Sequence, residues 1–289
     1  GDPYLSQSGI SRDTDQTFYF DARLDWKRSF GDHNLTAMMM YMMREYRHDV
    51  LPNRNQGYSG RITYDYANRY LLEFNFGYNG SERLASGTRF EFFPAASIGW
   101  VVSSEKFWEP LSQYVNHLKV RASYGTLGND NTGGVTFPFY SRFDLYSGNN
   151  ASNGFTNNLG DYIFGTLLTK GMLPGPIANA LATWEKSTKT NVAVDATLFN
   201  RLNLTVDFFM EKRTDILAQR GAEVPSSFGG ILPLENLGEV KNKGVDLSLN
   251  YHQRIQQVDF SLGGNFTFAR NEIVEMAEAA GTSKYMRKT

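Results

Sequence analysis

The sequence is dominated by segments in which apolar and polar residues alternate one by one. In residues 18–27, FYFDARLDWK, the odd-numbered positions carry Tyr, Asp, Arg, Asp and Lys, and the even-numbered positions carry Phe, Phe, Ala, Leu and Trp. Such alternation predicts a β-strand with one apolar and one polar face, because successive side chains of a strand point to opposite sides. The chain is therefore expected to consist mainly of β-strands.

Eight segments alternate in this way, and two less regular ones complete a set of ten expected strands. They are residues 18–27, 34–45, 58–66, 70–79, 94–102, 118–125, 191–198, 202–211, 243–251 and 259–268. Most are about 8 to 11 residues long, close to the roughly 9–11 residues with which a tilted strand crosses a bilayer. Strands of soluble proteins average only about 5–6 residues.

The connections between these segments are of two kinds. Short connections fall near 28–33, 67–69, 103–116, 199–201 and 252–258, and they alternate with long ones at 46–57, 80–93, 127–187 and 213–238. Short turns at one end and long loops at the other are typical of an outer-membrane barrel. The sequence therefore predicts an all-β fold, an antiparallel transmembrane β-barrel with short periplasmic turns and long extracellular loops.

Aromatic residues agree with a membrane position. Tyr70 and Tyr78 bracket an apolar stretch, and Trp26, Trp100 and Tyr251 lie close to short turns. Amphipathic rings at both ends of an apolar band are favoured at membrane–water interfaces. The alternative is that they are cross-strand pairs of an ordinary soluble sheet.

Composition narrows the function classes. The chain has no cysteine, which excludes disulfides, thiol chemistry and a cysteine zinc site, and its net charge of −1 gives no reason to expect a nucleic-acid partner. The mean hydropathy of −0.42 is compatible with a barrel, because half of each barrel strand faces a polar lumen. The sequence contains no run of about 18 apolar residues, so no transmembrane helix is predicted. Residues 1–20 do not resemble a signal peptide, so any export signal is expected to be removed or to lie upstream.

No catalytic constellation is recognisable, and no enzyme activity or cofactor is expected. The four histidines, at positions 33, 48, 117 and 252, are scattered without the spacing of metal ligands. The segment Gly128–Gly134 holds the oxygen-bearing side chains of Asn129, Asp130 and Asn131, like a calcium loop, but lacks a bidentate glutamate. A loop Ca²⁺ site is therefore a minor hypothesis beside an ordinary turn-rich loop.

Five blocks of sequence resemble the SusC/RagA type of TonB-dependent outer-membrane transporter. They are GRITYDYANRYLLEFNFGYNGSERLASGTRFEFFPAASIGW at 60–100 with SSEKFW at 103–108, LKVRASYGTLGN at 118–129, WEKSTKTNVAVD at 184–195, VPSSFGG at 224–230 with NLGEVKNKGVDLSLNY at 236–251, and FSLGGNFTFARNEI at 260–273. The sequence departs from that family's pattern around Gly77, Asn79, Glu82 and Leu84, which puts only the contacts of that loop in doubt.

The resemblance implies a multi-pass protein of the bacterial outer membrane, in contact with outer-membrane lipid. Such transporters have a barrel of about 22 strands filled by a plug, and residues 1–289 would be part of that single barrel domain, with the plug and the terminal strands outside this chain. The resemblance further implies import of an oligosaccharide or a peptide, with a SusD-like surface lipoprotein as lid and with energy delivered by TonB through the plug.

Two sets of residues are candidates for contact with a solute. Aromatic rings in the long loop 127–187 could stack on sugar rings or apolar peptide side chains, or could simply pack the loop against itself. The candidates are Phe137, Phe139, Tyr140, Tyr146, Phe155 and Tyr162. The second set is expected to face the lumen, either as a solute path or, as we favour, as salt bridges between strands or contacts with a plug. It comprises Arg61, Asp65, Glu73, Asn75, Lys119, Arg121, Asp195, Asp207 and Asp246.

Two other interpretations of the sequence remain. A self-contained barrel of ten strands, acting as a porin or surface enzyme, would pair its first strand with its last. A soluble β-rich glycan-binding module would turn its apolar residues toward a closed core.

Overall fold

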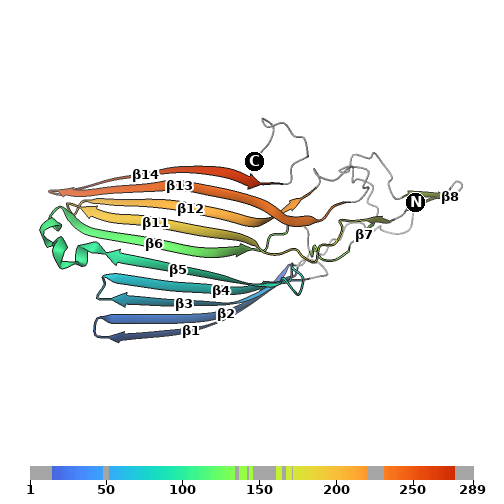
Figure 1. The fold of residues 1–289 in the computed structure, drawn as a ribbon, viewed down its shortest axis with the longest axis horizontal. Coiled ribbons are helices and arrows are strands. Elements are labelled where there is room, and N and C mark those ends of the chain that lie inside the picture. Colours follow the sequence, from blue (N-terminus) through green and yellow to red (C-terminus); the bar gives the residue numbers. More distant parts are fainter. Residues whose placement is uncertain are drawn as a thin grey trace, which may run out of the picture.

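Ten long strands form one antiparallel sheet in the computed structural model, which describes residues 15–47, 52–133, 137–141, 143–145, 161–164, 167–170, 172–220 and 231–276 (Figure 1). The strands are β1 (Gln16–Phe30), β2 (His33–Arg47), β3 (Asn53–Tyr66), β4 (Tyr70–Ser81), β5 (Phe90–Val101), β6 (Val115–Asn129), β11 (Glu185–Leu198), β12 (Leu202–Gln219), β13 (Leu234–Ile255) and β14 (Val258–Glu275). Each strand pairs with the next one in this order. The predicted all-β antiparallel array is confirmed.

The strands are longer than the alternation predicts. They run from 12 residues in β4 and β5 to 22 residues in β13, against the predicted 8 to 11. β12 shows why, since its alternation ends near Met210 but its pairing with β13 continues to Gln219. Backbone hydrogen bonds do not need an apolar face, so a strand that leaves the hydrocarbon layer can continue without alternation.

The segment between β6 and β11 contains four short strands that alternation cannot predict because each has only three or four residues. β7 (Phe143–Leu145) pairs with β10 (Met172–Pro174), and β8 (Asp161–Phe164) pairs with β9 (Leu167–Lys170). Two 3₁₀ turns, η1 (Val102–Ser104) and η2 (Lys106–Leu111), connect β5 to β6. None of the helices in the described residues has the length and apolar character to cross a membrane.

The connections are sorted between the two ends of the sheet as predicted. The connections at one end, called the turn end below, are the hairpins β1–β2, β3–β4, β11–β12 and β13–β14 and the η1–η2 segment (Figure 1). Residues with positive φ allow the tight hairpins, and they include Gly31 at +57°, Asn68 at +55° and Asn200 at +54°. The connections at the opposite end, called the loop end, are residues 48–52, 82–89, 130–184 and 220–233. The predicted long loops 46–57 and 80–93 are wrong in length, because β2–β5 extend into them and leave connections shorter than residues 102–114 at the turn end.

The register places the apolar residues of neighbouring strands on one face. Phe74 of β4 lies opposite Ile62 of β3 and Ala96 of β5, and Leu204 of β12 lies opposite Ala196 of β11 and Leu249 of β13. Large apolar side chains of this face are exposed on inner strands as well as on the edges of the sheet, with Phe74 at 43%, Ile62 at 46% and Phe208 at 54%. Such an apolar face suits contact with lipid, and we call it the outer face.

Two rows of rings cross the outer face. Near the turn end, His33, Tyr66, Tyr70 and Trp100 are in register across β2–β5, and nearer the loop end Tyr41, Tyr58, Tyr78 and Phe92 are in register across the same strands. The rows are separated by eight residues along β3, or roughly 27 Å of strand. At a tilt of roughly 35–45° this length spans about 19–22 Å along the membrane normal, somewhat less than the apolar band about 25 Å tall that aromatic girdles flank in such barrels.

The row at the turn end is fixed by Glu105, which lies between η1 and η2. Its carboxylate accepts hydrogen bonds from the Tyr70 hydroxyl at 2.7 Å and from the Trp100 indole N–H at 3.4 Å, and Arg69 lies 3.7 Å away. The Tyr70 hydrogen bond is the main reason why the pKa of Glu105 is lowered. Both rings thereby present a polar edge to the interface and an apolar body to the band.

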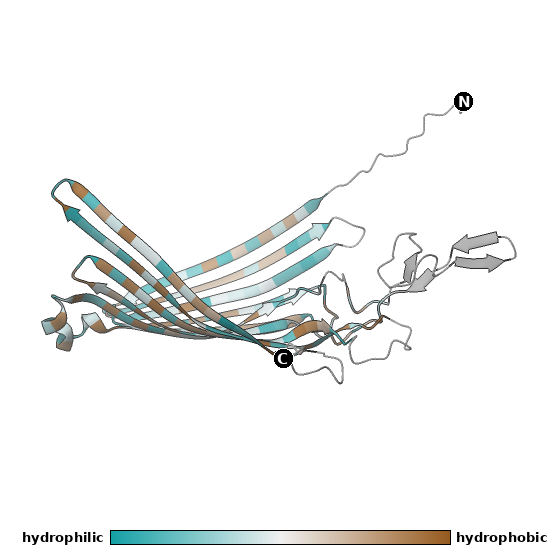
Figure 2. Cartoon of the chain, turned by 90° about the horizontal axis from the view of Figure 1, so that it is seen from above, coloured by the Kyte–Doolittle hydropathy of each residue, from teal (hydrophilic) through white to brown (hydrophobic). Residues whose placement is uncertain are grey.

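The sheet curves into an open trough, with β1 and β14 as its two edges (Figure 2). Within the described residues β1 and β14 do not pair with each other, so the self-contained ten-stranded barrel is not what this chain forms. Among the described residues only seven apolar side chains are buried, and four of them, Leu84, Phe93, Ala182 and Trp184, form one small cluster. The closed core that a soluble β-rich module requires is not present in the described part of the chain.

The two faces predict opposite responses to the same substitution. Phe74→Arg or Leu204→Arg should lower the free energy of unfolding from a bilayer by about 2–4 kcal/mol, because each puts a charge at the middle of the apolar band. Asn75→Arg and Thr205→Arg place the same charge one residue away on the polar face and should have a much smaller effect. Reversible urea unfolding in lipid vesicles measures the difference, and equal losses on both faces would contradict the assignment of the outer face.

Candidate functional site

All nine residues predicted to face the lumen lie on the face opposite the apolar one. Asp207 of β12 is directly opposite Ala193 of β11 and Asp246 of β13, and Arg121 of β6 is directly opposite Ala193. On the other half of the sheet, Arg61 is opposite Asn75, while Asp65 and Glu73 share the same face. These nine residues lie on six of the seven adjacent strands from β3 to β13, since β5 carries none of them, and the surface that they share is called the polar face.

A guanidinium joins three strands at the centre of the polar face. Arg121 donates from Nη2 to both oxygens of Asp207 at 2.7 and 2.9 Å, and from Nε to Asp195 at 3.2 Å. The hydroxyl of Thr205 donates to the second oxygen of Asp195 at 3.0 Å. Arginine suits this arrangement because its planar donors can engage two carboxylates at once.

A second group of ion pairs lies on β3 and β4. Arg61 Nη2 is 2.6 Å from Glu73 Oε2, and Asn75 Nδ2 donates to the other oxygen of Glu73 at 2.7 Å. Asp65 instead accepts hydrogen bonds from the Asn34 side chain at 3.0 Å and from the backbone N–H of Asn68 at 3.3 Å. Both groups therefore link neighbouring strands, Arg121 across β6, β11 and β12 and Arg61 across β3 and β4.

The polar face also has ionisable side chains that these networks leave without a partner. Asp246 lies directly opposite Asp207, and its Oδ1 atom is buried without a hydrogen bond, while Arg121 binds Asp207. Lys119 is opposite Asp195 in the register but makes no ion pair within the described residues. A hollow in the polar face runs between the two ion-pair groups. Its polar lining includes Asp65, Glu73, Lys119, Arg121, Ser123 and Asn191.

The connections at the loop end are held together by a small core above the polar face. The Trp184 ring packs edge-on against Phe93 with centroids 5.5 Å apart, and its indole N–H donates to the carbonyl of Arg89 at 2.9 Å. Phe93 in turn covers Gly128, where an added Cβ would collide with the Phe93 ring. The loop after β4 and the segment before β11 are thereby joined, which fixes the rim of the polar face.

Asn236 closes the same rim from the other side. Its side chain donates to the carbonyls of Asp215 at 2.6 Å and Thr183 at 3.1 Å, and accepts from the backbone N–H of Thr183 at 2.9 Å. Asp215 has a φ of +58°, at an irregularity in the pairing of β12 with β13. The sequence offered no sign of this role, because Asn236, like Leu84, contacts residues distant in the chain.

The residues considered for calcium use their oxygens within the protein. Asp130 accepts from Ser81 Oγ at 2.6 Å and from Asn55 Nδ2 at 3.0 Å. The side-chain oxygens of Asn129 and Asn131 accept backbone N–H groups two residues ahead, both at 3.1 Å. Within the described ranges, groups of three or more histidine and acidic side chains arranged for a metal are not found. A Ca²⁺ site in this loop stays a prediction.

Three of the six candidate loop aromatics form a cluster. The rings of Phe139 and Tyr140 are 4.4 Å apart, Phe137 lies 6.1 Å from each of them, and Tyr140 is 62% exposed. Tyr146 and Phe155 lie outside the described residues, and Tyr162 belongs to β8, where only the backbone is described. The three rings thus pack against one another and Tyr140 is still exposed to solvent, and contact of these rings with a solute stays a prediction.

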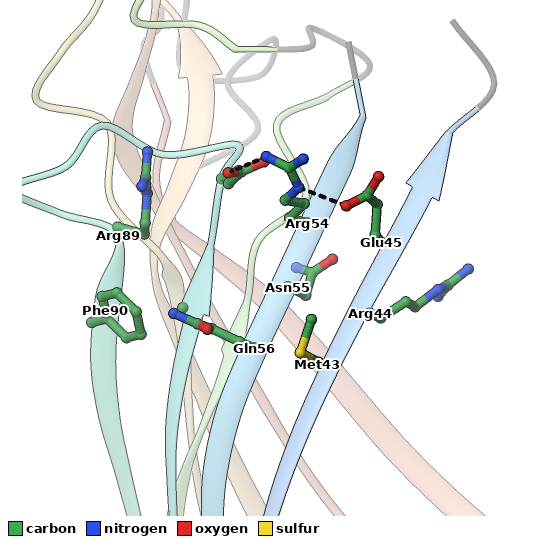
Figure 3. Close-up of a pocket in the computed structure, with 10 residues that line it drawn as sticks. Met43, Arg44, Glu45, Arg54, Asn55, Gln56, Arg89 and Phe90 are labelled. Carbon is green, nitrogen blue, oxygen red and sulfur yellow. Dashed lines mark hydrogen bonds and ion pairs between the residues drawn. The ribbon is translucent and has the colours of Figure 1, made fainter. Parts of the chain in front are cut away.

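A further hollow lies at the loop end between β2, β3 and β5, with Arg54 at its centre (Figure 3). Arg54 Nε is 2.9 Å from Glu45 and Arg54 Nη1 is 3.6 Å from Glu82, as the dashed lines in Figure 3 show. Met43 and Phe90 add apolar walls. Register places Glu45 and Arg54 on the outer face, so this hollow is separate from the polar face.

Comparison with known proteins identifies this arrangement. A family model described as TonB dependent receptor-like, beta-barrel matches residues 2–287. TonB-dependent receptor P3 of Formosa agariphila is 30% identical over 214 residues, which cover 74% of this chain and 19% of that protein. TonB-dependent receptor SusC of Bacteroides thetaiotaomicron is 27% identical over 247 residues, covering 84% of this chain and 23% of that protein. The chain thus spans about a fifth of the curated relatives it matches.

Solved structures agree on the fold. The RagAB peptide importer in its closed-closed state superposes with a TM-score of 0.76 at 22% identity, over 94% of this chain and 31% of that chain. The outer-membrane transporter YddB from Escherichia coli superposes with a TM-score of 0.59 at 12% identity, over 90% of this chain and 34% of that chain. These relatives are transporters and receptors of the outer membrane rather than enzymes. The chain belongs to the TonB-dependent receptor-like β-barrel family, of the SusC/RagA type, and is an outer-membrane protein forming an unclosed section of such a barrel.

Proposed function

We propose that this chain forms part of the wall of a barrel that imports an oligosaccharide or a peptide across the outer membrane. The observation that carries the proposal is the polar face, where a hollow lies between two ion-pair groups and includes a lysine without an ion pair within the described residues. A surface that offers both charges and amides can exchange hydrogen bonds with a hydrated solute as it passes.

The partners follow from the same proposal. A SusD-like surface lipoprotein would cover the loop end, and TonB would act through a plug that contacts the polar face. The buried oxygen of Asp246 supports such a contact, because a buried acceptor without a hydrogen bond is expected to find one in another part of the protein or in ordered water. Oligosaccharide and peptide are both retained as solutes, since the exposed ring of Tyr140 could stack on either.

Uptake by cells tests the proposal directly. A strain lacking the full-length protein, and the same strain carrying it on a plasmid, would be given fluorescent maltooligosaccharides or a fluorescent tryptic digest of casein. We expect one of the two mixtures to enter only the complemented strain, and entry to stop when a protonophore removes the proton gradient that drives TonB. Uptake that continues unchanged after the protonophore would indicate passive diffusion through a pore and would contradict the proposal.

A matched pair of ring substitutions tests the loop aromatics. Tyr140→Ala should weaken uptake of the transported mixture roughly 3-fold to 10-fold at low solute concentration, because one stacked ring contributes about 0.5–1.5 kcal/mol. Tyr114→Ala is the control, since Tyr114 is 54% exposed and also packs against a ring, Phe199, but lies at the turn end. Equal uptake by the Tyr140→Ala variant and the original protein would show that the cluster only packs the loop.

The central guanidinium makes a separate prediction about stability. Arg121→Ala leaves Asp195 and Asp207 without their cation beside Asp246, so the free energy of unfolding in vesicles should fall by about 1 kcal/mol, a value reduced for the partial exposure of Arg121. Asp246→Asn in the same background should recover part of the loss by removing one of the clustered carboxylates. No change in either variant would contradict a structural role for this network.

A further inference from the structure

The outer face changes character abruptly at the loop end of β12, β13 and β14. Its apolar series ends at Met210 on β12, at Val245 on β13 and at Phe268 on β14. Val245 is directly opposite both Phe208 and Phe268, and Met210 is the next residue after Phe208 on this face. The next residues on this face are cations on all three strands. They are Lys212, Lys241, Lys243 and Arg270, here called the outer basic patch, and all four are exposed.

The register brings these cations together in two pairs of like charge. Lys212 is directly opposite Lys241, and Lys243 is directly opposite Arg270. Side chains directly opposite each other in an antiparallel pair have Cβ atoms only about 4.5–5.5 Å apart, and like charges there are destabilising. Such an arrangement is favourable only when anions lie beside it.

The described residues supply only part of the anionic charge that would balance the patch. Glu239 lies 3.0 Å from Lys212 and 3.6 Å from Lys241, and Glu272 is opposite Lys241 in the register. Lys243 and Arg270 make no ion pair within the described residues. The patch therefore has an excess of positive charge at the edge nearest the apolar band, where Lys243 and Arg270 follow Val245 and Phe268.

The corresponding position on the other half of the sheet is balanced. There Arg54 is bound by Glu45 and Glu82 (Figure 3). Arg47 also pairs with Glu45, at 2.8 Å. An excess of cations is thus a property of β12–β14 and not of the whole rim. This contrast points to an anion that meets the barrel only on this side.

We propose that the outer basic patch binds the phosphate of a lipid headgroup in the outer leaflet. The apolar series below it runs from Leu202 to Met210, nine residues, which is about the length with which a tilted strand crosses the hydrocarbon layer. The cations therefore begin at the level of the headgroups. Arg270 can bind a phosphate with two parallel hydrogen bonds, Lys243 adds a point charge, and the acyl chains of the same lipid lie along Phe266 and Phe268.

Native mass spectrometry of the full-length protein in detergent tests this site, with dioleoyl phosphatidic acid as the phosphate-bearing lipid. Replacing both Lys243→Gln and Arg270→Gln should weaken binding of phosphatidic acid roughly 30-fold, because each cation near an anionic headgroup contributes on the order of 5-fold. The swap Lys243→Arg with Arg270→Lys keeps both charges and should retain most of the binding.

A matched control removes two cations from the polar face, near the same level along the strands as Lys243 and Arg270. Lys189 and Arg213 belong to β11 and β12, and both pair with Glu211 on the polar face. Lys189→Gln with Arg213→Gln should leave phosphatidic acid binding unchanged. The proposal is overturned by equal losses in the two double variants, by equal binding of dioleoylglycerol, which lacks the phosphate, or by inorganic phosphate displacing the lipid at equal concentration. The proposal stands or falls independently of import, since none of these measurements depends on a transported solute.

Discussion

The backbone hydrogen bonds between neighbouring strands are the interaction on which every other feature of this structure depends. In lipid an unpaired N–H or C=O group has no water to bind, so a chain that crosses with strands must pair each one with its neighbours. Pairing fixes the register, and the register fixes which side chains share a face. A slip of one residue between β3 and β4 would exchange Phe74 for Asn75 on the outer face, and with it the whole separation of lipid from water.

The same pairing distributes the chemistry of the protein. On the outer face it aligns rings into two rows and, above the band, aligns cations on β12–β14. On the polar face it brings Arg121 to Asp195 and Asp207, which lie 74 and 86 residues away in the chain. A charge of either sign is therefore positioned by its strand neighbours more than by its sequence neighbours. This explains why networks of arginine and aspartate can form without a hydrophobic core beneath them.

The middle of the sheet and its loop end are stabilised in different ways. The middle of each strand has an apolar side for lipid and a polar side for water. The loop end has its own small core, in which Trp184 packs against Phe93 and joins the segment before β11 to β5. Tyr140 lies between these two conditions, since its ring packs against Phe139 and Phe137 and is still 62% exposed.

Alternation by itself determined the ten strands, their antiparallel order, the sorting of turns and loops, and the face on which each of the nine polar residues lies, because a period of two leaves each side chain only two choices. It did not determine the true strand ends, since pairing beyond Met210 needs no apolar face. It also could not show that Asp130 binds Ser81 and Asn55, that Asn236 closes the rim, or that Lys243 faces Arg270. Those contacts join residues distant in the chain, and only the register of the folded sheet brings such residues together.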